Sequence, residues 1–201
     1  MATFDELIRK LIEGSPIERN FAVQELAKLG DPRAIEPLVE TMLSDTDSGV
    51  RQTAAIWLGK MGNPEAVPGL AQAVLTSADP VLRAHAADAL GLIRHPDAIP
   101  VLIHASFEHH PSVRLAAVWS LAQFSDPKVI SPLIDILGND YDEIEQYALT
   151  GIRKHMLINP DAILKLPTED RNRLGRTLQD KLHKELQNEL CKKPRRKQWR
   201  P

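Results

Sequence analysis

Five X-Pro pairs recur along the chain at an almost constant spacing, and this period constrains the fold more than any other feature. Successive pairs lie 32, 32, 31 and 33 residues apart. A fixed period of this length is typical of stacked supersecondary units, each too small to bury its apolar face alone. The pairs are Asp31-Pro32, Asn63-Pro64, His95-Pro96, Asp126-Pro127 and Asn159-Pro160.

A second set of residues keeps the same period and defines the first half of each unit. Alanine and leucine follow an arginine at three and seven positions, which is helical and not alternating spacing. After this first helix, the X residue would cap a second helix, and the proline would occupy its first turn, where no backbone donor is needed. The arginines stand twelve residues before the first four X residues, at Arg19, Arg51, Arg83 and Arg114.

Together these signals predict an all-α chain, an α-solenoid of about five helical-hairpin repeats. Residues 1–14 are predicted to form an N-terminal capping helix, and residues 167–191 a long C-terminal helix. That last helix would either close the end of the solenoid or dock on a partner. We expect the repeats at residues 15–44, 45–77, 78–108, 109–139 and 140–166.

A family resemblance is carried by the stretches VRQTAAIWLGKMGNPEAVPGLAQAV and VLRAHAADALGLIRHPDAIPVLIHA. They are similar to the HEAT-like repeat of the phycobilisome-lyase family, with its Val-Arg, paired alanines, Ala-Leu-Gly, Asp-Pro and Leu-Ile steps. The resemblance covers about residues 17–137, whereas the fifth copy has Glu145 in place of the arginine and lacks Ala-Leu-Gly. It implies a HEAT-repeat α-solenoid.

Motifs for catalysis are missing from the sequence. It contains no glycine-rich phosphate or dinucleotide motif, no H-E-x-x-H motif and no His-Glu step of the HEAT-repeat metallohydroxylases. The histidines at His104, His109 and His110, with Glu108 beside them, match no standard metal-site spacing. We therefore predict neither a metal nor a cofactor.

The single cysteine, Cys191, excludes an intramolecular disulfide and favours a reducing compartment. No apolar run approaches the roughly 18 residues that a membrane-spanning helix needs. A cytoplasmic protein without an integral membrane segment is the expectation.

The repeat register identifies outward positions on the second helices, which line the concave side of HEAT solenoids. Positions nine and thirteen after each capping residue would form a mixed polar and mildly acidic ladder, with adjacent helices about 8–10 Å apart. This ladder is either a solvated face or a groove for a protein segment of complementary charge. Its members are Glu40, Ser44, Gln72, Thr76, His104, Glu108, Asp135 and Asn139.

The first helices carry apolar residues where the family pattern is usually polar. Ile56 and Trp119 stand five positions after their repeat arginines, the register that Asp88 occupies in the third unit. Leu115 lies one turn before Trp119, and Leu92 one turn after Asp88. We predict that Ile56, Leu92, Leu115 and Trp119 form an exposed apolar stripe, a candidate contact for a partner protein. The alternative is that Trp119 packs as ordinary core.

Charge is distributed unevenly along the chain. There are 25 Lys and Arg against 27 Asp and Glu, but the last ten residues, KKPRRKQWRP, hold six bases and no acid. The body is therefore net acidic, which argues against nucleic-acid binding by the repeats. The tail is expected to be disordered, or to contact an anionic lipid, nucleic acid or acidic protein. Its bases are Lys192, Lys193, Arg195, Arg196, Lys197 and Arg200.

The sequence favours a non-catalytic, protein-binding solenoid that acts as a scaffold or as an assembly or chaperone-like factor. The resemblance implies a phycobiliprotein or another photosynthetic component as client. It also implies an alternative, a phycobilin lyase or lyase subunit that attaches or detaches bilins, commonly with a second HEAT-repeat chain. A lyase would need cations for two propionates and a proton donor, for which His104 and Asp135 are candidates. A third alternative is a HEAT adaptor unrelated to photosynthesis.

Overall fold

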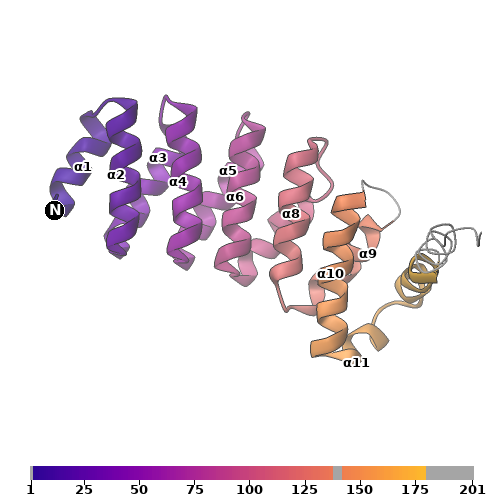
Figure 1. The fold of residues 1–201 in the computed structure, drawn as a ribbon. Helices are drawn as coiled ribbons and strands as arrows, with labels where there is room; N and C mark the ends of the chain where they lie inside the picture. The colour runs from indigo at the N-terminus through magenta and orange to yellow at the C-terminus, as the bar shows by residue number, and fades with distance from the viewer. Residues whose placement is uncertain (1, 138–141, 180–201) are drawn as a thin grey trace, which may run out of the picture.

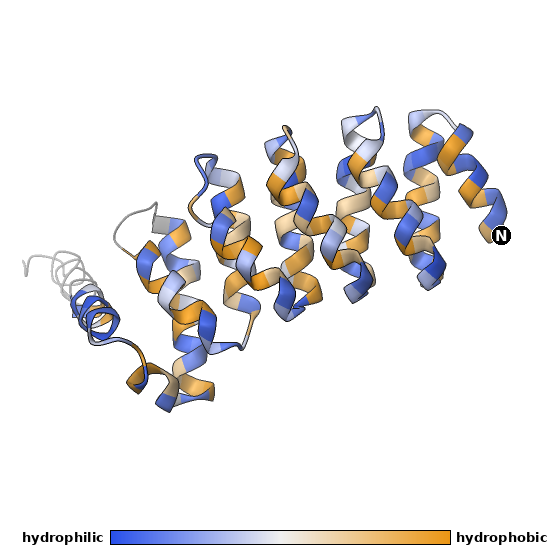
Figure 2. Ribbon diagram, turned by 180° about the vertical axis from the view of Figure 1, so that it is seen from behind, coloured by the Kyte–Doolittle hydropathy of each residue, from blue (hydrophilic) through white to orange (hydrophobic). Residues whose placement is uncertain are grey.

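The computed structural model describes residues 2–137 and 142–179, and within them every regular element is a helix, which confirms the predicted all-α solenoid. The helices follow one another as antiparallel pairs stacked side by side (Figure 1). The first helices form one row and the second helices form another behind it, with apolar and polar segments alternating along each helix (Figure 2).

One short helix, α1 (Phe4–Glu13), precedes the pairs, and a further helix at residues 168–179 follows them. The first helices are α2 (Pro16–Leu29), α4 (Ser48–Met61), α6 (Pro80–Ile93), α8 (Pro111–Gln123) and α10 (Asp142–Ile158). The second helices are α3 (Ile35–Ser44), α5 (Val67–Thr76), α7 (Ile99–Ala105), α9 (Ile130–Ile136) and α11 (Pro160–Leu164).

Each of the first four X-Pro pairs begins a one-turn 3-10 helix that leads directly into the second helix. These turns are η1 (Pro32–Ala34), η2 (Pro64–Ala66), η3 (Pro96–Ala98) and η4 (Pro127–Val129). The Asp31 carboxylate accepts the Arg33 backbone N–H at 2.9 Å, and Asn63 and Asp126 repeat this bond. The His95 ring nitrogen accepts the Asp97 backbone N–H at a longer 3.4 Å, so it is the weakest of these four caps. The X residues therefore cap the 3-10 turn rather than the α-helix itself.

The repeat arginines hold the loops between successive pairs. Arg19 forms a bidentate ion pair with Asp45 at 2.7 Å, and Arg51 donates to the Asp45 carbonyl from the next first helix. Two units later, Arg83 pairs with the Glu108 carboxylate at 3.1 Å, and Arg114 donates to the Glu108 carbonyl. Each of these two loops is thus clamped by the arginines on both sides of it, which explains why the arginine keeps the period of the repeat.

Small residues let neighbouring first helices approach closely. Ala54, Ala86 and Ala117 are completely buried. The Ser120 hydroxyl of α8 donates to the Ala87 carbonyl of α6 at 2.8 Å. A methyl group added at Gly91 would lie 2.8 Å from the Ser120 Cα, so at this point α6 and α8 leave no room for a side chain.

Both ends of the described solenoid are covered by further helix. At the N-terminal end, α1 buries Leu7 and Leu11 and begins with a capping box between Thr3 and Glu6. At the other end, Leu174 of the helix at 168–179 is buried, and the Ser131 hydroxyl donates to Asp170 at 2.6 Å. The first part of the C-terminal helix therefore packs against the repeats, and its predicted continuation to residue 191 lies outside the described residues.

We predict opposite effects for two glycine-to-alanine changes. Gly91→Ala should destabilise the fold by about 1–3 kcal/mol, because a methyl group there forces α6 away from the Ser120 backbone. Gly175→Ala should stabilise it by about 0.5–1 kcal/mol, since this helical glycine is exposed and has open space around it. Urea unfolding of both variants measures the difference, and equal effects would contradict the close approach of α6 and α8.

Candidate functional site: an apolar pocket on the first helices

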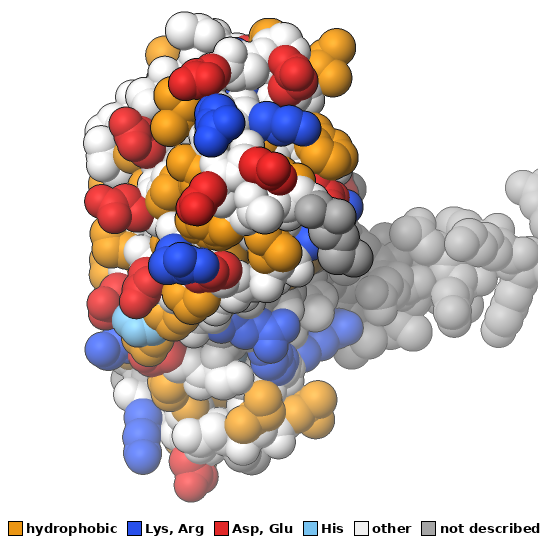
Figure 3. Space-filling view, turned by 90° about the vertical axis from the view of Figure 1, so that its left-hand side faces the viewer, with side chains coloured by type: hydrophobic (Ala, Val, Ile, Leu, Met, Phe, Trp, Pro, Cys, Tyr) orange, Lys and Arg blue, Asp and Glu red, His pale blue; other side chains and the backbone are white. Residues whose placement is uncertain are grey.

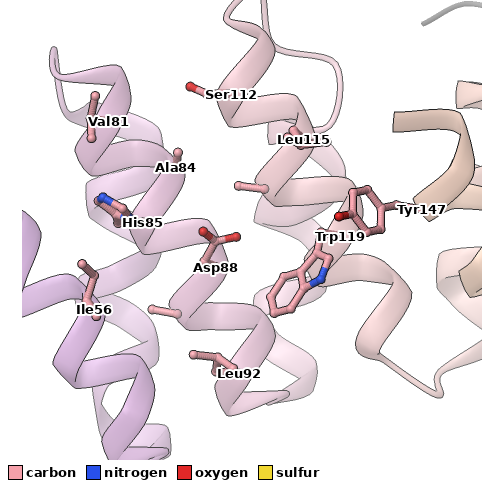
Figure 4. Close-up of a pocket in the computed structure, with 12 residues that line it drawn as sticks. Ile56, Val81, Ala84, His85, Asp88, Leu92, Ser112, Leu115, Trp119 and Tyr147 are labelled. Atoms are coloured by element: carbon pink, nitrogen blue, oxygen red, sulfur yellow. The ribbon is translucent and has the colours of Figure 1, made fainter. Parts of the chain in front are cut away.

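An open pocket lies on the row of first helices. It has a volume of about 630 Å³ and is lined from α4, α6, α8 and α10. The side chains that surround it come from successive helices (Figure 4). The pocket is therefore built by the stacking of repeats, and no single repeat could form it.

All four residues of the apolar stripe line this pocket. Ile56 comes from α4, Leu92 from α6, and Leu115 and Trp119 from α8. Leu92 is apolar, yet 48% of its surface is exposed to solvent, and the other three residues are half-buried. The structure thus brings together a stripe that the sequence predicted from register alone, and Trp119 is not fully enclosed core.

His85, Tyr147 and Val81 are among the other residues that line the pocket. His85 of α6 and Tyr147 of α10 share one register, two positions after the repeat arginine or the Glu145 that replaces it. Val81 lies in the first turn of α6. Sequence reasoning examined only the fifth position after the arginine. Because residues three positions apart share a helix face, the second and fifth positions together would have indicated His85 and Tyr147.

Asp88 is the only carboxylate among the residues that line the pocket. Burial raises the pKa of its carboxyl above the ordinary value, and the nearby His85 offsets only part of this rise. Within the described residues, no hydrogen bond or ion pair joins the Asp88 side chain to another group. A carboxylate that is partly desolvated and has no counter-ion marks a candidate binding position.

The predicted ladder on the second helices is not gathered into one groove. Glu40, Gln72 and His104 are exposed, but they stand on separate helices, and Gln72 borders a smaller pocket of about 440 Å³ between α3 and α5. The Ser44 and Thr76 hydroxyls donate to carbonyls of their own helices at 2.7 and 2.9 Å.

Two of the three acidic members of the ladder already have partners inside the chain. Glu108 pairs with Arg83, and Asp135 pairs with Arg173 of the C-terminal helix. Both line a third pocket, of about 310 Å³, that does not join the others. Binding by the ladder stays a prediction, and most of its polar groups bond within the protein.

Two sets of predicted binding residues are not covered by the described structure. Asn139 and the basic tail from Lys192 to Arg200 lie outside the described residues.

Among residues 2–137 and 142–179, no group of three or more His, Cys, Asp or Glu side chains is arranged to hold a metal ion. The helices in those ranges fall short of the length and apolarity that crossing a lipid bilayer requires.

The N-terminal end of the solenoid offers no comparable site. Acidic, basic and apolar side chains are interspersed on it (Figure 3). Ile12 and Ile17 are exposed there, and Lys10 lies 5.7 Å from the centre of the Phe21 ring. No pocket described above reaches this end, so the first-helix pocket remains the strongest candidate.

The sequence matches the family model of HEAT repeats. The match covers residues 4–82 and again 67–152, well over half of the chain. The chain belongs to the HEAT-repeat family. No curated protein matches its sequence.

Solved structures agree with this HEAT fold. The complex of CpcE and CpcF of phycocyanin lyase from Nostoc sp. PCC7120 is similar with a TM-score of 0.66 at 21% identity, over 81% of this chain and 68% of that one. Human deoxyhypusine hydroxylase matches with a TM-score of 0.53 at 17% identity, over 77% and 74%. A designed armadillo repeat protein in complex with the peptide (KR)4 matches with 0.55 at 15% identity, over 89% and 99%. At these identities the likeness shows the fold alone.

The position of Asp88 predicts a gain in stability when its charge is removed. Because the folded state raises the pKa of this carboxyl, the folded protein is penalised at neutral pH, where Asp88 is ionised. Asp88→Asn should therefore unfold at a higher urea concentration than the wild type at pH 7. The gain should disappear as the pH falls below about 4, where the unfolded carboxyl is also protonated.

Glu40→Gln provides the matched control for this measurement. Glu40 is an exposed carboxylate on α3, outside the pocket, so its change should stay within about 0.5 kcal/mol of the wild type. A loss of stability in Asp88→Asn at pH 7 would mean that Asp88 has a stabilising partner, against our description of the site.

Proposed function

We propose that this HEAT-repeat chain is a non-catalytic scaffold or assembly factor whose partner protein binds in the first-helix pocket. One observation carries the proposal: apolar and aromatic side chains from the first helices of four successive repeats line a single open pocket. Contiguous exposed apolar patches commonly mark protein interfaces. Trp119 adds to this argument, since tryptophan is enriched among the residues that dominate binding energies.

The arrangement of the repeats suits a scaffold. The arginine clamps and the close approach of α6 and α8 hold the lining residues on rigid helices rather than on loops. A partner would therefore meet a preformed surface and would lose little free energy to ordering of the scaffold.

Two classes of partner follow from the similarity to the CpcE and CpcF complex of phycocyanin lyase. The first is a phycobiliprotein or another photosynthetic component. The second is another repeat chain, since CpcE is found with CpcF in that structure. We place this protein in the cytoplasm, where either class of partner would be met.

A bilin lyase or lyase subunit is the second candidate function, favoured by the same structural similarity. The pocket is large enough to consider a bound organic group, and Asp88 could supply a proton. However, no lysine or arginine is among the residues that line it, so two propionates would find no strong cationic partner. A HEAT adaptor unrelated to photosynthesis remains the third candidate, and the (KR)4 peptide held by a designed repeat protein illustrates this type of binding.

We predict that Trp119→Ala weakens partner binding, or dissociates a homodimer, by at least tenfold, about 1.4 kcal/mol. The partner would be purified from the source organism, identified by mass spectrometry and titrated against both proteins. Because Trp119 is half-buried, the change should cost less stability than the 3–5 kcal/mol typical of roughly complete tryptophan burial.

Trp57→Ala is the control for this prediction. Trp57 is also a half-buried tryptophan of a first helix, but it lies outside the pocket, with the Lys60 ammonium 4.3 Å from its ring centre. It should leave the affinity unchanged. If Trp119→Ala costs 3–5 kcal/mol of stability while the affinity per folded molecule is kept, Trp119 is ordinary core and the proposal is wrong.

For the bilin alternative, we predict that the protein mixed with phycocyanobilin and an apo-phycobiliprotein gives no covalent adduct above the spontaneous rate. The reason is the lack of lysine and arginine in the pocket lining. Absorbance of the denatured protein measures the adduct. A clear adduct that Asp88→Asn or Asp135→Asn abolishes would establish the lyase function instead.

A further inference from the structure

The pocket has one charged position that the chain itself does not neutralise. Asp88 stands in the middle of α6, and its neighbours along the pocket are Ala84, Ala89, Leu92 and Leu115. His85 lies one turn away, and no hydrogen bond joins the two side chains in the described structure. A carboxylate in such surroundings is costly to keep unless an outside cation satisfies it.

Two aromatic rings line the same pocket as this carboxylate. The Asp88 side chain projects from α6 toward α8, where the Trp119 indole lies, and the Tyr147 hydroxyl of α10 points toward the same space (Figure 4). Trp and Tyr faces attract cations through their ring quadrupoles, and the attraction grows when water is excluded. The carboxylate and the two rings are therefore complementary to a single positive charge.

The extent of the lining favours an extended occupant over a compact one. It reaches from Ile56 on α4 to Tyr147 on α10, across four neighbouring helices. With adjacent helices about 8–10 Å apart, this corresponds to roughly 24–30 Å of groove. A small organic cation would cover only the part between α6 and α8, whereas a peptide segment could also place apolar side chains on Ile56, Leu92 and Val81.

Resting on the proposed function, we infer that the partner presents a lysine or arginine flanked by apolar side chains, with its cationic group seated between Asp88 and the rings of Trp119 and Tyr147. The charged group gives position and specificity, and the apolar neighbours fill the rest of the pocket. The net acidic body of the chain steers such a segment toward the surface.

A random peptide display library, selected on the full chain, tests this inference. Enriched sequences should contain a basic residue between apolar residues, and selection on Asp88→Asn should lose this preference. Enriched sequences without a basic residue would overturn the inference.

A double-mutant cycle with one selected peptide makes the test quantitative. Replacing its lysine by norleucine, which keeps the carbon stem and removes the charge, should weaken binding to the wild type at least about tenfold. The same replacement should change binding to Asp88→Asn less than about threefold, because the partner of the charge is already gone. Equal losses with both proteins would contradict a lysine–Asp88 contact.

Two further measurements separate this inference from the proposed function. Butylammonium chloride should compete with the peptide only weakly, and competition as strong as that of the peptide itself would show a small-cation site instead. If Trp119→Ala abolishes peptide binding while the lysine is dispensable, the pocket is a protein contact and only the cation inference fails. If neither change matters, both proposals fail.

Discussion

Close packing between successive first helices is the constraint on which the rest of this structure depends. Gly59 and Gly91 lie where a methyl group would meet the backbone of the next helix, and Ser120 bonds across to the Ala87 carbonyl. Interiors packed at this density tolerate little change in volume. The spacing of the helices is therefore fixed, and with it the relative positions of every side chain that projects from their outer faces.

The pocket is a consequence of this spacing combined with a few departures from the repeat. At the fifth position after the repeat arginine, the successive units place Ile56, Asp88 and Trp119. A polar residue in all three units would give a plain solvated face. The arginine clamps at Asp45 and Glu108 keep the pairs in order while leaving these positions unconstrained. The proposed binding surface and the clamps that order the repeats thus use different residues of the same helices.

The period of the X-Pro pairs was sufficient to predict the all-α solenoid, because capping and proline placement are local effects. Register also indicated that Ile56, Leu92, Leu115 and Trp119 share a face, and all four line the pocket, although only Leu92 is as exposed as the predicted stripe required. Their role in binding stays a prediction. The sequence did not indicate which polar side chains form ion pairs or hydrogen bonds within the protein. Asp135 pairs with Arg173, 38 residues further along the chain, and Glu108 pairs with Arg83, so the expected ladder loses two of its three acidic members to internal pairs. Tyr147 and His85 were missed because the second position after the repeat arginine, or after the Glu145 that replaces it, was not included in the predicted stripe.

Hydroxyl-radical footprinting of the chain, alone and with its purified partner, measures most directly whether the first-helix pocket is the binding surface. Our account predicts that Trp119, Tyr147 and Leu92 lose most of their oxidation in the complex, while His104 on the second-helix row and Trp57 remain as reactive as in the free chain. Protection of His104 with unchanged oxidation of Trp119 and Tyr147 would contradict it, and would place the partner on the second helices.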